Sequence, residues 1–502
     1  MFKLADQTKE SPDRILGGVS EESVVARPAR ERSRRLSVMQ ESLLLGHLMS
    51  PNPEKFNVPL AVSLSGKLDK AALQNAFDVL VRRHEVLRTR YFVKESLPFI
   101  EVDSAVPVAI KEISWSETSP AREEEIRKVI EDEASRPFFL EREWPVRVRL
   151  FCRGADQHTL LVVLHHIACD EGSLSIFRDE LASVYEASVE GRTMAERPLP
   201  MQYSDYAEEQ RCWMLGPEMQ RELVFWRREL AGAPAALPLG EKRSCAPLAA
   251  DESSVYGRSI DGQTAERCLA LCATYRSTPF ALLLAALAAT LGQHTGMDDI
   301  LIGTPISTRG GNEMERLIGY FVNTIVLRTK LERNMTFAKL AQQTRATAFR
   351  AFAHRTIPFQ KVVEELAPPR EPDVHPFFRV MLSFHRDNEK AVRFGELNIK
   401  QVPLPSNSLK CDLLVSVRLE GAKIDLECEF NPARFDLAYG QRLMKKFTTL
   451  LHDASLRPTA PLEDCYSHLN RIDREFFETQ ASEVRSGSLT LLKNVKRVAA
   501  QA

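Results

Sequence analysis

The apolar positions of this chain recur with two different spacings, and these predict alternating strands and helices. Residues 160–164 form an unbroken apolar run, which is typical of a strand buried on both faces. Residues 145–151 alternate apolar and polar side chains, as expected of a half-buried strand, and the turn at 154–157 would join the two as an antiparallel pair. Further strands are expected at 56–66 and 106–113.

Helical spacing appears between these strands. Asp69 can cap a helix whose apolar face carries Leu73, Phe77 and Leu80. Ser173 can cap a second helix, and residues 121–135 predict a strongly charged one. Thr278 and Pro279 are a favourable helix start, and the all-round apolar run 280–291 predicts a buried helix. Residues 299–309 then read as a strand with an exit turn.

The same patterns divide the chain into four parts. Residues 1–35 lack periodicity and predict a flexible N-terminal extension, and 36–195 form a first lobe. A Gly- and Pro-containing stretch near 190–202 sets the boundary to a second lobe, 196–474. Residues 475–502 predict a polar C-terminal tail with room for one short helix. Periodicity alone therefore indicates an α/β protein with mixed sheets in two lobes.

Composition narrows the class of protein. A net charge of −1 gives no general case for nucleic acid or an anionic membrane as partner, and no apolar stretch reaches the length of a membrane span. The basic cluster at 27–35 is interpreted as a solvated linker. Nine cysteines are scattered without any C-x-x-C, so neither a disulfide framework nor a zinc site is indicated. A monomer in a reducing cytoplasm is expected, and the N-terminus is not a signal peptide.

Candidate chemistry lies at the end of the run 160–164. Two adjacent histidines, His165 and His166, follow it, and then come Asp170, Glu171 and Gly172. Adjacent residues on a strand point to opposite faces, so one histidine is expected to be structural and the other available for chemistry. A neutral imidazole near pH 7 can take a proton from an attacking amine or hydroxyl.

This segment resembles the His-His-x-x-x-Asp-Gly motif of the condensation domains of nonribosomal peptide synthetases and of related chloramphenicol acetyltransferase-like enzymes. One departure is visible: Glu171 follows the aspartate, and the glycine comes one position later. Six other segments match the family's motifs in the family's order. They are LSVMQ with LL at 36–44, RHEVLRTRY at 83–91, YSDYA at 203–207, LIGYFVNTIVLR at 317–328, PFQKVV at 358–363 and PFFRVM at 376–381.

The resemblance implies a fold and roles for individual residues. The expected fold is α/β, with two chloramphenicol acetyltransferase-like lobes in a V-shaped pseudo-dimer and a tunnel between them. His166 would be the general base, or the orienting group, for an amine or hydroxyl that attacks a thioester. His165 would be structural, with its ring satisfied inside the first lobe. Asp170 would pair with an arginine of the second lobe, and Arg309 is the candidate for a bidentate contact.

The tunnel lining is expected to include residues near this motif. Glu171 either faces inward beside His166, where it would raise the histidine pKa, or points to solvent while Gly172 allows the close backbone approach of the motif glycine. The candidate lining residues are Glu171, Gly172, Ser307, Tyr320 and Asn323.

The leading expectation is a free-standing condensation enzyme in nonribosomal peptide or other antibiotic biosynthesis, because the chain has no room for an adenylation or carrier domain. It would transfer an acyl or aminoacyl group from an acyl- or peptidyl-carrier protein to a small-molecule or carrier-bound amine or alcohol. No metal or organic cofactor is implied, since the phosphopantetheine belongs to the carrier.

Three alternatives stay open. An acyl-coenzyme A-dependent acyltransferase shares the histidine motif. An epimerisation domain usually has Ser-Trp after the aspartate, where this chain has Ser173 and Leu174. A non-catalytic recruiting domain typically loses the second histidine, whereas His166 is present here.

Overall fold

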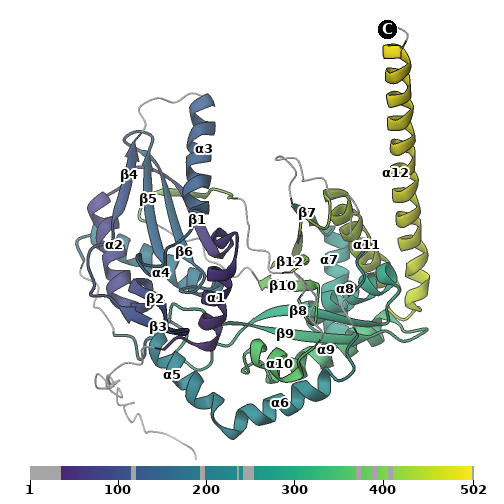
Figure 1. Cartoon of the computed structure of the whole chain (residues 1–502), viewed down its shortest axis with the longest axis horizontal. Coiled ribbons are helices and arrows are strands. Elements are labelled where there is room, and N and C mark those ends of the chain that lie inside the picture. Colours follow the sequence, from purple (N-terminus) through teal and green to yellow (C-terminus); the bar gives the residue numbers. More distant parts are fainter. Residues whose placement is uncertain are drawn as a thin grey trace, which may run out of the picture.

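A computed structural model describes residues 35–114, 120–192, 198–234, 237–240, 254–368, 375–386, 394–404 and 411–499. The chain forms two lobes that open like a V, the first drawn in purple and blue and the second in teal to yellow (Figure 1). The predicted extension, with its basic cluster up to Arg34, lies outside the described residues.

The N-terminal lobe is built on a five-stranded sheet with the order β11-β1-β6-β5-β4. Its strands are β1 (Asn57–Ser65), β4 (Ile110–Ser114), β5 (Val146–Cys152), β6 (Gln157–His165) and β11 (Asn398–Gln401). The predicted antiparallel pair is confirmed, because β5 and β6 pair from Val146↔Leu164 to Cys152↔His158. The strand expected at 106–113 begins only at Ile110.

Helices and short elements complete this lobe. They are α1 (Val38–Met49), α2 (Lys70–Arg83), α3 (Pro120–Ser135), α4 (Glu171–Val189), two 3-10 turns at Pro53–Phe56 and Glu85–Arg88, and a hairpin of β2 (Thr89–Lys94) and β3 (Leu97–Val102). Asp69 caps α2 as predicted, since its carboxylate accepts from the Ala72 N–H. The cap of α4 differs from the prediction: it is Asp170, whose carboxylate accepts from the Ser173 N–H at 2.7 Å, because the helix begins two residues before Ser173.

The C-terminal lobe contains a six-stranded mixed sheet with the order β7-β13-β12-β10-β8-β9. Its strands are β7 (Val255–Ser259), β8 (Asp299–Ser307), β9 (Val322–Lys330), β10 (Val380–Arg386), β12 (Leu413–Glu420) and β13 (Lys423–Phe430). The helices of this lobe are α7 (Gly262–Thr274), α8 (Pro279–Thr295), α9 (Phe337–Ala353), α10 (Phe359–Leu366) and α11 (Leu437–Leu456). As predicted, Thr278 caps α8, and this helix is buried on all sides from Ala281 to Gly292.

Three segments cross between the lobes, so the boundary predicted near residue 195 does not divide the two cores. The first leads through α5 (Tyr203–Met214) to α6 (Pro217–Glu229) along the base of the V (Figure 1). The second, residues 317–321, belongs to the second half of the sequence but packs its apolar side chains into the N-terminal core. The third carries β11, which pairs antiparallel with β1 from Val62↔Gln401 to Ser65↔Asn398.

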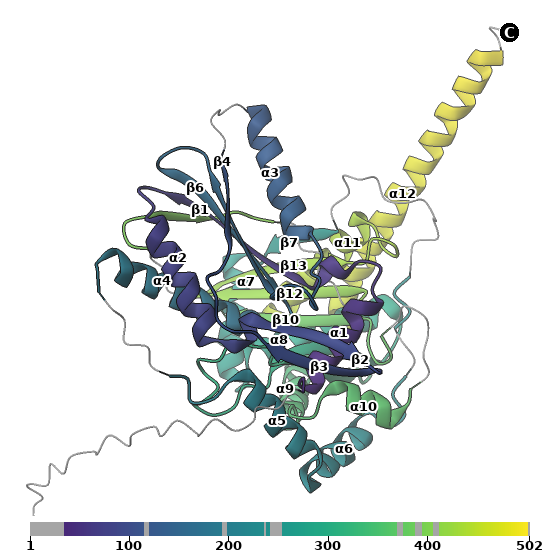
Figure 2. The same ribbon diagram turned by 60° about the vertical axis from the view of Figure 1, so that its left-hand side comes forward.

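The C-terminal segment differs from the predicted polar tail. Residues Leu462–Ala499 form one helix, α12, which runs away from the body of the molecule in both views (Figures 1 and 2). Its first turns bury Leu462, Cys465, Leu469 and Ile472. Within the described residues no single helix has the length and apolarity to cross a membrane; α7 and α8 pass that test only jointly, as a pair bent by 111°.

Candidate functional site

The two histidines at the end of β6 have opposite environments, as strand alternation predicts. His165 is fully buried, and its Nδ1 accepts a hydrogen bond from the Ile167 N–H at 3.1 Å. Its Nε2 therefore carries the proton and donates to Nδ1 of His47 at 3.2 Å. Burial lowers the pKa of His47, which keeps that ring neutral and able to accept. Both ring nitrogens of His165 thus have hydrogen-bond partners inside the N-terminal lobe. One of these partners, His47 on α1, was not indicated by any sequence pattern.

His166 is partly exposed and lies where the lobes meet. Its Nδ1 is 2.9 Å from the Cys169 carbonyl oxygen, which can only accept, so Nδ1 carries the proton and Nε2 holds the lone pair. The ring of Tyr320, from the segment that crosses between lobes, meets the imidazole edge-on with centroids 5.4 Å apart. The local turn at 166–169 therefore fixes the tautomer that a general base requires.

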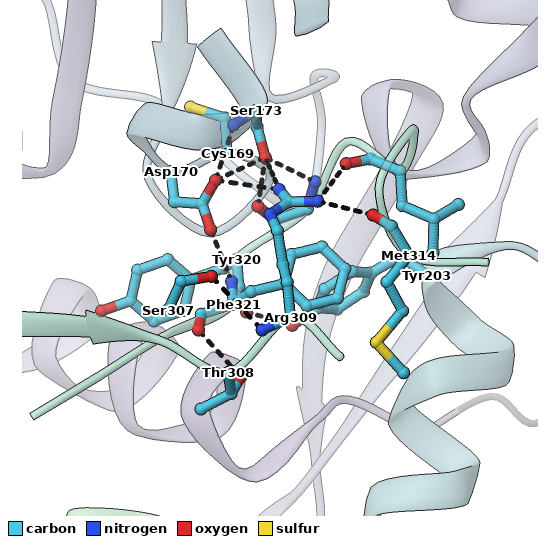
Figure 3. A network of polar contacts seen from close by, with 12 residues as sticks. Cys169, Asp170, Ser173, Tyr203, Ser307, Thr308, Arg309, Met314, Tyr320 and Phe321 are labelled. Atoms are coloured by element: carbon cyan, nitrogen blue, oxygen red, sulfur yellow. Dashed lines mark hydrogen bonds and ion pairs between the residues drawn. The ribbon is translucent and has the colours of Figure 1, made fainter. Parts of the chain in front are cut away.

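Asp170 holds the lobes together immediately beside this histidine. Its Oδ1 accepts from Nη2 of Arg309 at 3.0 Å, and its Oδ2 accepts from the Phe321 N–H at 2.9 Å (Figure 3). The residue is 2% exposed. Breaking a buried, charged contact of this kind costs roughly 3–5 kcal/mol. The contacts are those expected of a structural residue at the interface.

Arg309 meets Asp170 through one nitrogen, so the predicted bidentate fork is replaced by a wider network. Nη2 also donates to Oγ of Ser173 at 2.7 Å, and Nη1 donates to the carbonyls of Met314 and Leu317 at 3.0 and 2.6 Å (Figure 3). The guanidinium stacks over the Phe321 ring at 4.0 Å. The second terminal nitrogen, Nη1, thus binds the loop that leads to Tyr320 in place of the second carboxylate oxygen of Asp170.

The crossing segment is locked in place by one glycine and one tyrosine. A Cβ added to Gly319 would lie 1.9 Å from the Tyr203 ring, so only glycine allows this approach. The hydroxyl of Tyr203 donates to the Tyr320 carbonyl at 2.6 Å. Oγ of Ser173 accepts from the Gly319 N–H at 3.0 Å. These contacts set the position of Tyr320 against His166.

The three predicted lining residues of the second lobe have different environments. Tyr320 lies against His166, and burial raises the pKa of its phenol, so it is neutral near pH 7. Ser307 is exposed at the end of β8 and accepts from the Arg309 N–H at 3.2 Å. Asn323 does not line a cavity: it is 4% exposed and donates to the carbonyls of Arg355 and Ile357. Asn323 lies at a buried position of β9, and its amide therefore binds the backbone of residues 355–357 in the C-terminal lobe.

Glu171 is largely exposed, as in the second of its two predicted orientations, but its carboxylate also reaches the other lobe. Its Oε2 lies 2.6 Å from Nδ1 of His385 on β10, so the side chain bridges the lobes while remaining 63% exposed. Gly172 lies beside the interface network, where an added Cβ would be 3.4 Å from Nε of Arg309. That separation is an ordinary van der Waals contact, so the close backbone approach predicted at Gly172 is not seen.

A cavity of about 380 Å³ adjoins this contact. It lies on the face of the C-terminal sheet and is lined by Gly257, Arg258, Ser259, His385, Ser416, Val417, Arg418, Asp425, Leu426 and Glu427. Among the described residues, no group of three or more His, Cys, Asp or Glu side chains has the arrangement of a metal site.

The cysteines in the described part of the chain are all free thiols. Cys268 and Cys272 are buried, as their spacing of one helical turn predicts. Burial raises the pKa of Cys169, beside the histidine motif, well above its usual value. A protonated, buried thiol is a poor nucleophile, so Cys169 contributes its carbonyl to His166 and not its sulfur.

Comparison with known proteins identifies the class to which this geometry belongs. The sequence matches the condensation domain family over residues 31–473. It is 30% identical over 436 residues to a subunit of the linear gramicidin synthase of Brevibacillus parabrevis, a match that covers 86% of this chain and 6% of that protein. The chain thus spans less than a tenth of that relative. The chain belongs to the condensation domain family of nonribosomal peptide synthetases.

Solved structures agree on the fold. The X-domain from teicoplanin biosynthesis superposes with a TM-score of 0.77 at 24% identity, covering 88% of this chain and 99% of that one. The first condensation domain of the calcium-dependent antibiotic synthetase, in complex with a substrate analogue, gives a TM-score of 0.70 at 19% identity, covering 86% and 98%. The predicted fold of two chloramphenicol acetyltransferase-like lobes with mixed sheets is therefore confirmed.

Proposed function

We propose that this chain catalyses a condensation in which an acyl or aminoacyl group passes from a carrier-protein thioester to an amine or alcohol. The observation that carries the proposal is the tautomer and position of His166: the Cys169 carbonyl holds its Nδ1 proton, which leaves the basic lone pair on Nε2, and the ring lies where the lobes meet. Membership of the condensation domain family supports the reaction class.

In this reaction His166 would accept a proton from the attacking nitrogen or oxygen as the new bond forms, and the proton would pass to the departing thiolate. Positioning of both substrates between the lobes would supply much of the rate, since effective molarities of well-oriented groups are large. A general base typically contributes about 10²–10⁴-fold. His166→Ala is therefore expected to lower kcat by about that factor without unfolding the protein.

The test uses purified protein with an acyl-loaded carrier protein, the same acyl group on coenzyme A, and pooled amine and alcohol acceptors. Product formed only with the loaded carrier, and lost in His166→Ala, is the expected outcome. The matched control is His468→Gln, because the side chain of His468 on α12 is 43% exposed and pairs with Asp453 far from the lobe interface. Product formed from coenzyme A alone would contradict the carrier requirement, and full activity of His166→Ala would contradict the role of His166.

One observation favours a second candidate function, that of a recruiting domain. The X-domain that this fold resembles has also been solved in complex with OxyB, superposing with a TM-score of 0.77 at 24% identity and covering 89% of this chain and 99% of that one. A domain with this function would bind a loaded carrier and a partner protein and leave the thioester intact. Tight carrier binding without acyl transfer, unaffected by His166→Ala, would decide for this alternative.

A further inference from the structure

The contact between Glu171 and His385 connects the histidine motif to the open face of the C-terminal sheet. Glu171 is the first residue of α4, and His385 is on β10, so the 2.6 Å contact spans the two lobes. Glu171 occupies the position at which the family motif has glycine. The contact therefore exists because of this chain's own departure from the motif.

The imidazole of His385 is held at both nitrogens. Its Nε2 lies 2.6 Å from Oγ of Ser383, which is two residues away on the same strand and so on the same face. Its Nδ1 faces the Glu171 carboxylate. His385 therefore keeps a fixed orientation, while the second carboxylate oxygen of the largely exposed Glu171 remains accessible to a molecule in the cleft.

The cavity beyond His385 has a polar floor. One row of paired residues crosses the four strands β10, β12, β13 and β7 and consists of His385, Arg418, Asp425 and Ser259. The row beside it consists of Ser383, Ser416, Glu427 and Gly257. The alternate positions, such as Val415 and Leu419, are buried in the core on the other face of the sheet. A cavity of about 380 Å³ with this lining has the size of a small-molecule site.

Charges on this floor are partly compensated by one another. Asp425 contacts Lys423 at 2.6 Å and accepts from the Ser259 hydroxyl at 2.5 Å, and Arg418 stands opposite it in register. Glu427 is paired with Ser416 on one neighbouring strand and with Gly257 on the other. The floor thus presents carboxylates, hydroxyls and the guanidinium of Arg418 to a polar ligand.

We propose that this cavity holds the acceptor, and that Glu171 selects acceptors whose amino group arrives as the ammonium over alcohols of the same shape; the bound ammonium releases one proton to solvent before the neutral amine attacks. This inference rests on the proposed condensation function and deepens it. A carboxylate only accepts hydrogen bonds, and it also attracts the full opposite charge of an ammonium group, whereas a neutral hydroxyl offers the hydrogen bond alone. The proposal concerns a free, small-molecule acceptor, because a group that enters on the long arm of a carrier, whether donor or acceptor, has less need of a compact, charged cavity.

The selection is tested first by binding, so that the result does not depend on turnover. L-phenylalaninamide and (S)-3-phenyllactamide differ only in an amino group against a hydroxyl, and at pH 6.5 the amine is mostly protonated. Calorimetric titration is expected to show tighter binding of the amine to the wild type. Glu171→Gln should weaken amine binding about tenfold to a hundredfold and change alcohol binding less than about threefold.

Two variants separate recognition from a general charge effect. Asp179→Asn removes the same charge from an exposed position of α4, about two turns away, and is expected to leave both affinities unchanged. Glu171→Asp keeps the carboxylate and should restore part of the preference. An amine preference that persists in Glu171→Gln, or that is equally lost in Asp179→Asn, would overturn the proposal.

Turnover with a loaded carrier then separates a failure of the proposed condensation function from a failure of amine selection by Glu171. Selectivity of the wild type is expected to appear as a lower KM for the amine, with the KM for the loaded carrier unaffected by Glu171→Gln. Amine-selective binding without any acyl transfer would contradict the condensation function alone. Acyl transfer to both acceptors with no preference that depends on Glu171 would contradict the selection alone.

Discussion

Asp170 shows how one side chain can serve local structure and the interface together. Its carboxylate caps α4, accepts from Arg309 of the second lobe and accepts from the Phe321 N–H. All of these partners donate, so both oxygens of the side chain must accept, which an amide in its place could not do. These contacts favour a role for Asp170 in positioning its neighbours over a role in proton transfer.

We predict that Asp170→Asn lowers the free energy of unfolding by about 3–5 kcal/mol, because it leaves Arg309 without its buried counter-charge. Activity should fall together with stability, since Tyr320 and His166 would lose their relative position. Urea denaturation and condensation assays on the same samples measure both. An Asn variant of unchanged stability but no activity would show instead that Asp170 takes part in the chemistry.

The residues of this network differ in how far the sequence reveals them. Asp170 was recognisable because it stands in the histidine motif, and Arg309, in the exit turn predicted after residue 299, was named as its partner from the family resemblance. His47 was not, because its contact with His165 spans 118 positions and no pattern on α1 distinguishes it. Asn323 was expected in the cavity on the basis of its motif, whereas its amide serves the loop of Arg355 and Ile357.

At the scale of elements, the crossing segment 317–321 is the part of the second half that completes the N-terminal core. Its position depends on the contact between Gly319 and the Tyr203 ring. We predict that Gly319→Ala destabilises the protein by about 1–3 kcal/mol, because the added methyl overpacks a closed contact. It should also lower activity, since Tyr320 follows directly. Thermal unfolding and turnover are the measurements.

The matched control for this substitution is Gly262→Ala. Gly262 begins α7, and no described atom lies within 4 Å of an added Cβ. Alanine there should leave stability unchanged or improve it slightly, because it favours helix. Equal effects of the two substitutions would mean that the Tyr203 contact does not position the segment.

The helix α12 combines a packed base with a projecting end. Lys446 on α11 is fully buried and contacts Asp473 of α12 at 2.8 Å. We predict that truncation after Cys465 costs more than about 3–5 kcal/mol, since it removes the apolar side chains of Leu469 and Ile472 and the carboxylate that pairs with this lysine's buried charge.

Two further variants locate that effect. Truncation after Thr479 keeps Leu469, Ile472 and the contact between Lys446 and Asp473, so it should change the free energy of unfolding by less than about 1 kcal/mol. Asp473→Asn, in the full chain, should reproduce much of the longer truncation's loss. Chemical denaturation of the three proteins provides the comparison, and a stable Asp473→Asn protein would assign the loss to apolar packing alone.

At the scale of the whole molecule, buried histidines make stability depend on pH. Burial lowers the pKa of His375 to about 4, where its ring stacks on Phe378 with centroids 3.7 Å apart. Burial, and then the nearby Lys446 and Arg442, lower the pKa of His294 to about 4 as well. In the unfolded chain a histidine takes up its proton near pH 6.5, so the unfolded state binds more protons between about pH 6.5 and 4.

We therefore predict that the free energy of unfolding is highest above about pH 6.5 and falls as pH is lowered toward 4, by about 2–3 kcal/mol for each of these histidines. His375→Phe keeps the stacked ring and removes the titration. The variant should lose less stability over this range than the wild type, as measured by urea denaturation at several pH values. Identical pH dependence of the two proteins would refute the assignment to His375.

Much of the architecture followed from the sequence by itself. Periods of two and 3.6 residues are properties of the local chain, so the β5–β6 pair, the buried helix α8 and the opposite environments of His165 and His166 were predictable. Motif segments added the family and the candidate residues of the lobe interface. Boundaries were less accurate, as at β4 and at α12, because exposed segments of strands and helices carry little apolar signal.

Only the tertiary structure decided which distant residues meet. Packing brings His47 to His165, places residues 317–321 in the core of the other lobe, and turns Glu171 toward His385. No local pattern encodes such contacts, because each depends on how two separately patterned surfaces fit together. The sequence determined which elements form and which chemistry is present; the closure of the two lobes determined where that chemistry is placed.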